Sequence, residues 1–137
     1  MVKINHQPGI LMAAIVLMLV TLFISNGWSM DTNGYQNISM DRFVQMMDHK
    51  DFVLINVHIP YAGEIPATDL LIPYNGIEQH KNELPNDTHT KIVVYCMSGP
   101  MGYVAAEKLV AMGYRRVIYF QGGMVSWKKS GKSMVSR

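Results

Sequence analysis

The chain has 137 residues, which is the length of one domain. Apolar residues make up 49% of it and charged residues 16%, against roughly 25% charged in an ordinary soluble domain. Twelve Lys and Arg against ten Asp and Glu leave a net charge of +2. That balance excludes a protein that binds nucleic acid mainly by neutralising phosphates. The one cysteine excludes an intramolecular disulfide and a CxxC pair.

The first 29 residues are typical of an export segment. Residues 10–24, ILMAAIVLMLVTLFI, are apolar except for Thr21, follow Lys3 and precede the small residues Gly27 and Ser29. This pattern predicts a signal peptide. The apolar stretch nearly reaches the ~20 residues of a spanning helix, so an uncleaved signal anchor stays open. We therefore expect a periplasmic or extracellular protein, with membrane contact only through residues 10–28 if the segment is uncleaved.

The next segments alternate between helix and strand patterns. Residues 30–38 are polar and predict a linker. Ser39 predicts a helix cap before Met40–His49, and the apolar run FVLINV at 52–57 predicts a buried strand. Three X-Pro pairs predict a long extended loop from Pro60 to Pro73, with a short strand near 70–72. Residues 76–84 predict a short helix.

The second half repeats this alternation around the cysteine. It predicts a strand over 91–95, a tight loop over 96–102, a helix over 103–112, a strand over 117–120 and a short helix over 124–129. Strands that alternate with helices predict an α/β domain with a parallel sheet.

Cys96 is the strongest candidate for chemistry. It directly follows a predicted buried strand and precedes a predicted helix, and sites in open α/β sheets lie beyond the carboxyl ends of strands. A helix N-terminus offers unpaired N–H groups and a partial positive charge, which favour a reactive thiolate over a thiol.

These motifs, taken together, resemble the single-domain rhodanese family. Cys96 at the end of a strand, the glycine-containing loop, Met112-Gly113-Tyr114 and Gly122-Gly123 with Trp127 are similar to the second half of that family's domain. Upstream, FVLINVHIPYAGEIP at 52–66 is similar to its other signature, a strand leading to Gly-x-Ile-Pro.

The resemblance implies a sulfurtransferase with a three-layer α/β fold, in which a central, mostly parallel sheet is flanked by helices. It implies a domain over 39–131 and a tail over 132–137. It also implies that Cys96 carries sulfur as a persulfide, with no cofactor and no metal. The residues of the substrate-binding loop would be Met97, Ser98, Gly99, Pro100, Met101 and Gly102. The expected partners are a sulfane-sulfur donor and a thiol acceptor or reductant protein, and we expect a monomer that binds no nucleic acid.

The chain departs from the family pattern at four positions. The commonest family loop has Arg where this chain has Met97 and Met101, and Asp-Val-Arg stands where this chain has Asn56-Val57-His58. Because thiosulfate is a dianion, losing two guanidinium partners predicts poor use of thiosulfate. His58 is a candidate accessory group, since histidine titrates near neutral pH. Phosphatases related to this fold bind phosphate through an Arg at the end of the corresponding loop. Residues 96–107 contain no basic residue, so we set a phosphatase function aside.

Two alternatives remain open from the sequence. The first is a catalytically silent module of this family that docks a partner. The second is a soft-metal site, because Cys96, Met97 and Met101 place three sulfur atoms within six residues and such ligands select Cu(I).

Overall fold

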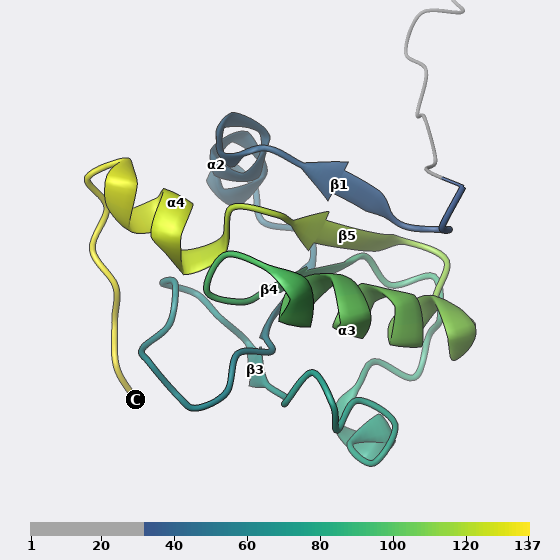
Figure 1. Cartoon of the computed structure of the whole chain (residues 1–137). Helices are drawn as coiled ribbons and strands as arrows, with labels where there is room; N and C mark the ends of the chain where they lie inside the picture. Colours follow the sequence, from purple (N-terminus) through teal and green to yellow (C-terminus); the bar gives the residue numbers. More distant parts are fainter. Residues whose placement is uncertain (1–31) are drawn as a thin grey trace, which may run out of the picture.

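The computed structural model describes residues 32–137 and builds them around one parallel sheet. The five strands lie in the order β1-β5-β4-β2-β3 (Figure 1). Their bounds are Gln36–Ile38 for β1, Val53–Asn56 for β2, Leu70–Leu71 for β3, Ile92–Tyr95 for β4 and Val117–Phe120 for β5. The predicted α/β class is confirmed, and β4 lies in the middle of the sheet, where its carboxyl end is flanked by two neighbours.

Helices cover both faces of the sheet. These are α2 (Met40–Asp48), α3 (Pro100–Ala111) and α4 (Gly123–Lys129), with a 3-10 turn at Lys81–Glu83. In Figure 1, α3 lies in front of the sheet. The packing of their buried residues places α2 and α4 on the opposite face. Two apolar clusters fill the layers between. One contains Cys96, Tyr119 and the α3 residue Leu109, and the other contains Phe43 of α2 and Trp127 of α4.

Side chains along β4 alternate between these two clusters. Ile92 and Val94 belong to the α3 side, and Val93 and Tyr95 belong to the α2 and α4 side. All four are buried, as expected for a central strand covered on both faces. The alternation continues to Cys96, whose side chain therefore lies on the α3 side of the sheet.

Three elements differ from the sequence predictions. The segment predicted as a linker contains β1, because residues 36–38 pair with β5 and bury Ile38. The short helix predicted over 76–84 is confined to the turn Lys81–Glu83. Separate turns precede it, one of them closed by the hydrogen bond that Gly76 N–H donates to the Pro73 carbonyl at 2.8 Å. The helix predicted from Tyr103 begins three residues earlier, with Pro100 in its first turn, where its missing N–H costs nothing.

The C-terminal tail packs against the long loop that follows β2. Val135 and Glu64 exchange two backbone hydrogen bonds of 2.9 Å, and the guanidinium of Arg137 binds the Glu64 carboxylate at 3.0 Å. Glu64 is only 6% exposed. The tail and this loop lie side by side in Figure 1.

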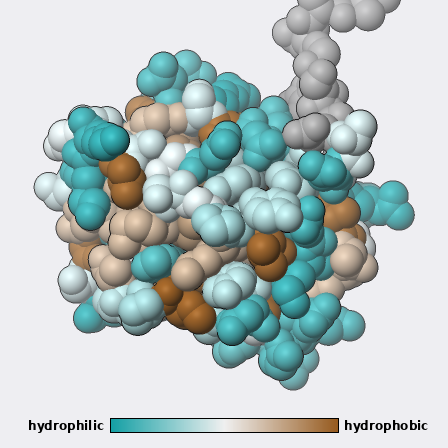
Figure 2. Space-filling model, in the orientation of Figure 1, coloured by the Kyte–Doolittle hydropathy of each residue, from teal (hydrophilic) through white to brown (hydrophobic). Residues whose placement is uncertain are grey.

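The face shown in Figure 2 mixes hydrophilic and hydrophobic residues. The larger hydrophobic side chains exposed among the described residues are Tyr61, Tyr103 and Val135. Within residues 32–137, no helix is both long and apolar enough to cross a membrane. The predicted export segment lies outside the described residues.

Candidate active site

Cys96 lies at the carboxyl end of the central strand. It directly follows β4, and residues 97–99 connect it to α3. The residue is 2% exposed. Because the sheet is parallel, the carboxyl ends of β2 and β5 flank it on the same edge. The sheet therefore places the cysteine where α/β proteins build their sites.

The sulfur atom forms two hydrogen bonds with Gly99. The Gly99 N–H donates to Cys96 Sγ over 3.3 Å, and the thiol donates to the Gly99 carbonyl oxygen over 3.1 Å. Gly99 is the residue that caps α3, a helix of 12 residues. Because the positive end of a helix lies within its first turn, the sulfur is in a region that favours negative charge. Among the hydrogen bonds of residues 32–137, Gly99 is the loop residue whose N–H reaches this sulfur.

The rest of the predicted loop has mixed surroundings. Ser98 and Pro100 are exposed, and Gly102 is buried. Met97 packs against the cluster on the α2 and α4 side, whereas Met101 packs against the cluster that contains Cys96. The two thioethers thus lie in different layers of the fold. This packing does not gather three sulfur atoms around one point, and it argues against the Cu(I) alternative. No group of three His, Cys, Asp or Glu side chains suited to a metal occurs among residues 32–137.

The start of α4 binds the backbone of the cysteine loop. Met124 N–H donates to the Cys96 carbonyl at 3.0 Å, and Val125 N–H donates to the Met97 carbonyl at 2.9 Å. Gly123 has a φ of +51°, and a Cβ built on it would lie 2.2 Å from the Cys96 carbonyl oxygen. Glycine is therefore required here by both conformation and space. The family resemblance included Gly122-Gly123 but did not indicate that Gly123 contacts the cysteine.

Tyr119 is a member of the site that no sequence motif marked. Its hydroxyl donates to the Gly99 carbonyl over 2.7 Å. Its ring occupies the space beside Gly102, where an added Cβ would lie 2.4 Å from the ring. Burial, and then the charge of Cys96, raise the pKa of Tyr119 to about 12. The available signal was the period of two along β5, which places residues 117 and 119 on the same side of the sheet as Cys96.

His58 lies just beyond the carboxyl end of β2, next to β4 in the sheet. Its backbone N–H donates to Asn56 Oδ1 at 3.0 Å, and the Asn56 amide in turn donates to the Gly63 carbonyl at 3.1 Å. Its ring atom Nδ1 is buried and has no hydrogen-bond partner among residues 32–137. Burial lowers the pKa of His58, so the ring is neutral at physiological pH. No described contact joins His58 to Cys96.

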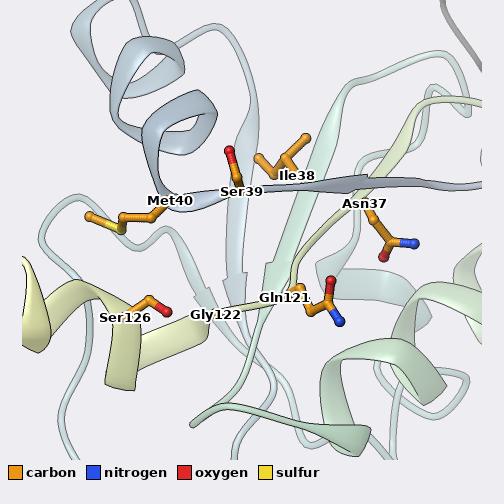
Figure 3. Close-up of a pocket in the computed structure, with 7 residues that line it drawn as sticks. All are labelled: Asn37, Ile38, Ser39, Met40, Gln121, Gly122 and Ser126. Carbon is orange, nitrogen blue, oxygen red and sulfur yellow. The ribbon is translucent and has the colours of Figure 1, made fainter.

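A pocket opens at the carboxyl ends of β1 and β5 (Figure 3). Its volume is about 370 Å³. Its lining residues are uncharged: Asn37, Ile38, Ser39, Met40, Gln121, Gly122 and Ser126. Figure 3 shows the side-chain amides of Asn37 and Gln121 on the same side of the strands. Cys96 is not part of this lining, but Gly123, which packs on the Cys96 carbonyl, is the next residue after Gly122.

Comparisons with known proteins agree with this geometry. The family model "Rhodanese-like domain" matches residues 33–130. A protein named "Sulfurtransferase" from Allochromatium vinosum is 32% identical over 95 residues, which cover 67% of this chain and 86% of that protein.

Two solved structures share the fold. A rhodanese-related protein from Thermoplasma volcanium has a TM-score of 0.63 at 24% identity, covering 74% of this chain and 98% of that one. A human single-domain sulfurtransferase has a TM-score of 0.61 at 19% identity, covering 68% of this chain and 95% of that one. The arrangement of strand, cysteine and helix, together with the match over residues 33–130, shows that this chain belongs to the rhodanese-like domain family.

Proposed function

We propose that this protein is a sulfurtransferase that carries sulfane sulfur on Cys96 as a persulfide. The observation that carries the proposal is the hydrogen-bonded sulfur at the end of β4, with the Gly99 N–H at 3.3 Å and the N-terminus of α3 beside it. Family membership and the relative named a sulfurtransferase support the same chemistry.

The reaction has two balanced steps. The Cys96 thiolate attacks the outer sulfur of a donor persulfide; the new S–S bond forms as the old one breaks, and the donor leaves as a thiolate. An acceptor thiolate then attacks the terminal sulfur of the Cys96 persulfide and releases the Cys96 thiolate. No external oxidant or reductant is consumed. Such double displacement is covalent catalysis with ping-pong kinetics.

The residues around Cys96 favour a donor that carries little negative charge. Met97 and Met101 offer no cation, and the nearby pocket has an uncharged lining. A hydrogen bond from a charged group contributes about 1.5–3 kcal/mol, so the absence of two guanidinium groups corresponds to a loss of roughly 100-fold or more for a dianion such as thiosulfate. We infer that a persulfide or polysulfide is the better donor.

The test is the intact mass of reduced, metal-free protein from residue 30 onward, before and after exposure to thiosulfate or glutathione persulfide. Cys96→Ser is the control. The proposal expects one added sulfur atom from the persulfide, removed by excess thiol and absent in Cys96→Ser. If neither donor adds sulfur, the proposal is wrong, and a partner-docking module becomes the better description.

We also propose export, on the strength of the apolar run at residues 10–24. The full chain, expressed with a C-terminal tag in a Gram-negative host, should be recovered from the periplasm or the membrane fraction. Replacing two leucines of the run, Leu17 and Leu19, by Arg should retain it in the cytoplasm. Recovery of the unchanged chain from the cytoplasm would overturn this assignment.

A further inference from the structure

Two donors share the carbonyl oxygen of Gly99. The Cys96 thiol lies 3.1 Å from it and the Tyr119 hydroxyl lies 2.7 Å from it. The N–H of the same glycine lies 3.3 Å from the sulfur. Gly99 therefore links the sulfur to Tyr119. Its carbonyl oxygen accepts from both side chains, and its N–H donates to the sulfur.

This arrangement changes when the sulfur loses its proton. A thiolate or persulfide anion no longer donates to the Gly99 carbonyl, and it would then face an oxygen that is itself partly negative. The side chains of Met97 and Met101 offer no donor that could relieve this repulsion. Among the described residues, Tyr119 is the side chain with a hydroxyl hydrogen-bonded to this oxygen.

We propose that Tyr119 is a positioning residue for the anionic forms of Cys96: its hydroxyl holds the Gly99 carbonyl and offsets its negative charge, so that the Gly99 N–H stays directed at the sulfur. For the thiolate this inference stands on the geometry alone, and for the persulfide it rests on the proposed function.

Two further observations support this role. Burial, together with the charge of Cys96, raises the pKa of Tyr119 to about 12, so the phenol keeps its proton and remains a donor throughout the physiological range. The ring also determines which residue fits at position 102. A Cβ there would lie 2.4 Å from the Tyr119 ring, so a residue larger than glycine would displace the tyrosine from Gly99.

The test compares Tyr119→Phe with Tyr114→Phe. Both wild-type tyrosines are buried and donate to a backbone carbonyl over 2.7 Å, Tyr119 to Gly99 and Tyr114 to Pro85. Each variant keeps the ring and removes one hydroxyl. The readout is the rate of Cys96 alkylation by iodoacetamide, a neutral reagent, measured from pH 5 to pH 10. Because only the thiolate reacts, the midpoint of this profile reports its stability.

Tyr119→Phe should move the midpoint upward and slow alkylation at pH 7 by about threefold to tenfold, the effect of part of a hydrogen bond to a charged group. Tyr114→Phe should leave the midpoint unchanged and the alkylation rate at pH 7 within twofold of the wild-type rate. Equal profiles for the two variants would overturn the inference. Alkylation needs no sulfur donor, so a failure of sulfur loading would count against the proposed function and leave this test intact.

A reciprocal measurement covers the case in which Tyr119→Phe does not fold. Linkage requires that the charge on Cys96 and the proton on Tyr119 affect each other equally. The ring titration of Tyr119, followed by NMR, should therefore move to lower pH in Cys96→Ser than in the wild type. An unchanged titration would contradict the coupling.

Discussion

The backbone of Gly123 lies directly against the carbonyl of Cys96. A Cβ at residue 123 would approach that oxygen to 2.2 Å, and the neighbouring Met124 N–H donates to it at 3.0 Å. Two segments that are 27 residues apart in the sequence thus contact each other and hold the cysteine loop in place.

Gly123→Ala should destabilise the fold and disturb Cys96. The φ of +51° costs a residue with a Cβ about 1–2 kcal/mol, and contact with backbone atoms that cannot move aside adds about 1–3 kcal/mol. We expect a loss of roughly 2–5 kcal/mol in urea unfolding and slower alkylation of Cys96.

Gly131→Ala is the matched control. Gly131 has a φ of +79°, but no atom lies within 4 Å of the place that its Cβ would take. Gly131→Ala should lower the free energy of unfolding only by the cost of the positive φ, about 1–2 kcal/mol, and should leave the alkylation of Cys96 at the wild-type rate. If the two variants unfold at the same urea concentration, the close approach of Gly123 to Cys96 has no energetic weight.

Replacing Met97 and Met101 with Arg should restore use of thiosulfate. Each guanidinium would supply a charge-assisted hydrogen bond to the dianion, and the pair is expected to raise kcat/KM for thiosulfate by about tenfold or more. Met112→Arg, at the partly buried end of α3, controls for added charge elsewhere. An unchanged rate for the double variant would show that the loop methionines do not limit thiosulfate use.

His58 should make the fold less stable in mild acid. Burial holds its pKa in the folded protein below the ordinary value of 6.5, so the unfolded chain binds the proton first as the pH falls. The contribution of neutral His58 to the free energy of unfolding is therefore fully present above about pH 6.5, and it is lost as the pH falls through the folded-state pKa.

The measurement is urea unfolding at pH 7.5 and pH 5.0. His58→Gln should narrow the difference in unfolding free energy between the two conditions. His89→Gln, at an exposed residue, should leave that difference as in the wild type. A wild-type protein that is equally stable at both pH values would refute the assignment to His58.

Arg137 should stabilise the loop that follows β2. Its guanidinium binds the buried Glu64 carboxylate at 3.0 Å, and its backbone N–H donates to the Tyr61 hydroxyl at 3.0 Å. Because the Arg137 side chain is half exposed, solvent screens the pair, and Arg137→Ala should cost about 1–2 kcal/mol.

Lys108→Ala provides the comparison, since Lys108 lies 3.6 Å from an exposed carboxylate of Glu78. That pair should contribute less than about 1 kcal/mol. Thermal unfolding of both variants compares the contributions of the two ion pairs, and Arg137→Ala should have the lower melting temperature. Equal melting temperatures would mean that the contact of Arg137 with Glu64 is no stronger than an ordinary surface pair.

The sequence predicted well wherever the determining pattern was local. Continuous apolar runs identified β2, β4 and β5, and Ser39 marked the start of α2, where it accepts from Arg42 N–H at 3.4 Å. The place of Cys96 between strand and helix followed from the same kind of evidence. The prediction for 76–84 was wrong because residue composition does not show whether one short turn is continued by the next.

What the sequence determined by itself is the order of the elements, the class of the fold and the position of its one cysteine, because apolar periodicity and turn residues act over a few neighbouring positions. Only the tertiary structure decided that β1 joins the sheet, that Tyr119 reaches Gly99, and that Gly123 touches Cys96. These contacts join segments about 20 to 80 residues apart. Their geometry depends on strand pairing and close packing, which no local pattern records.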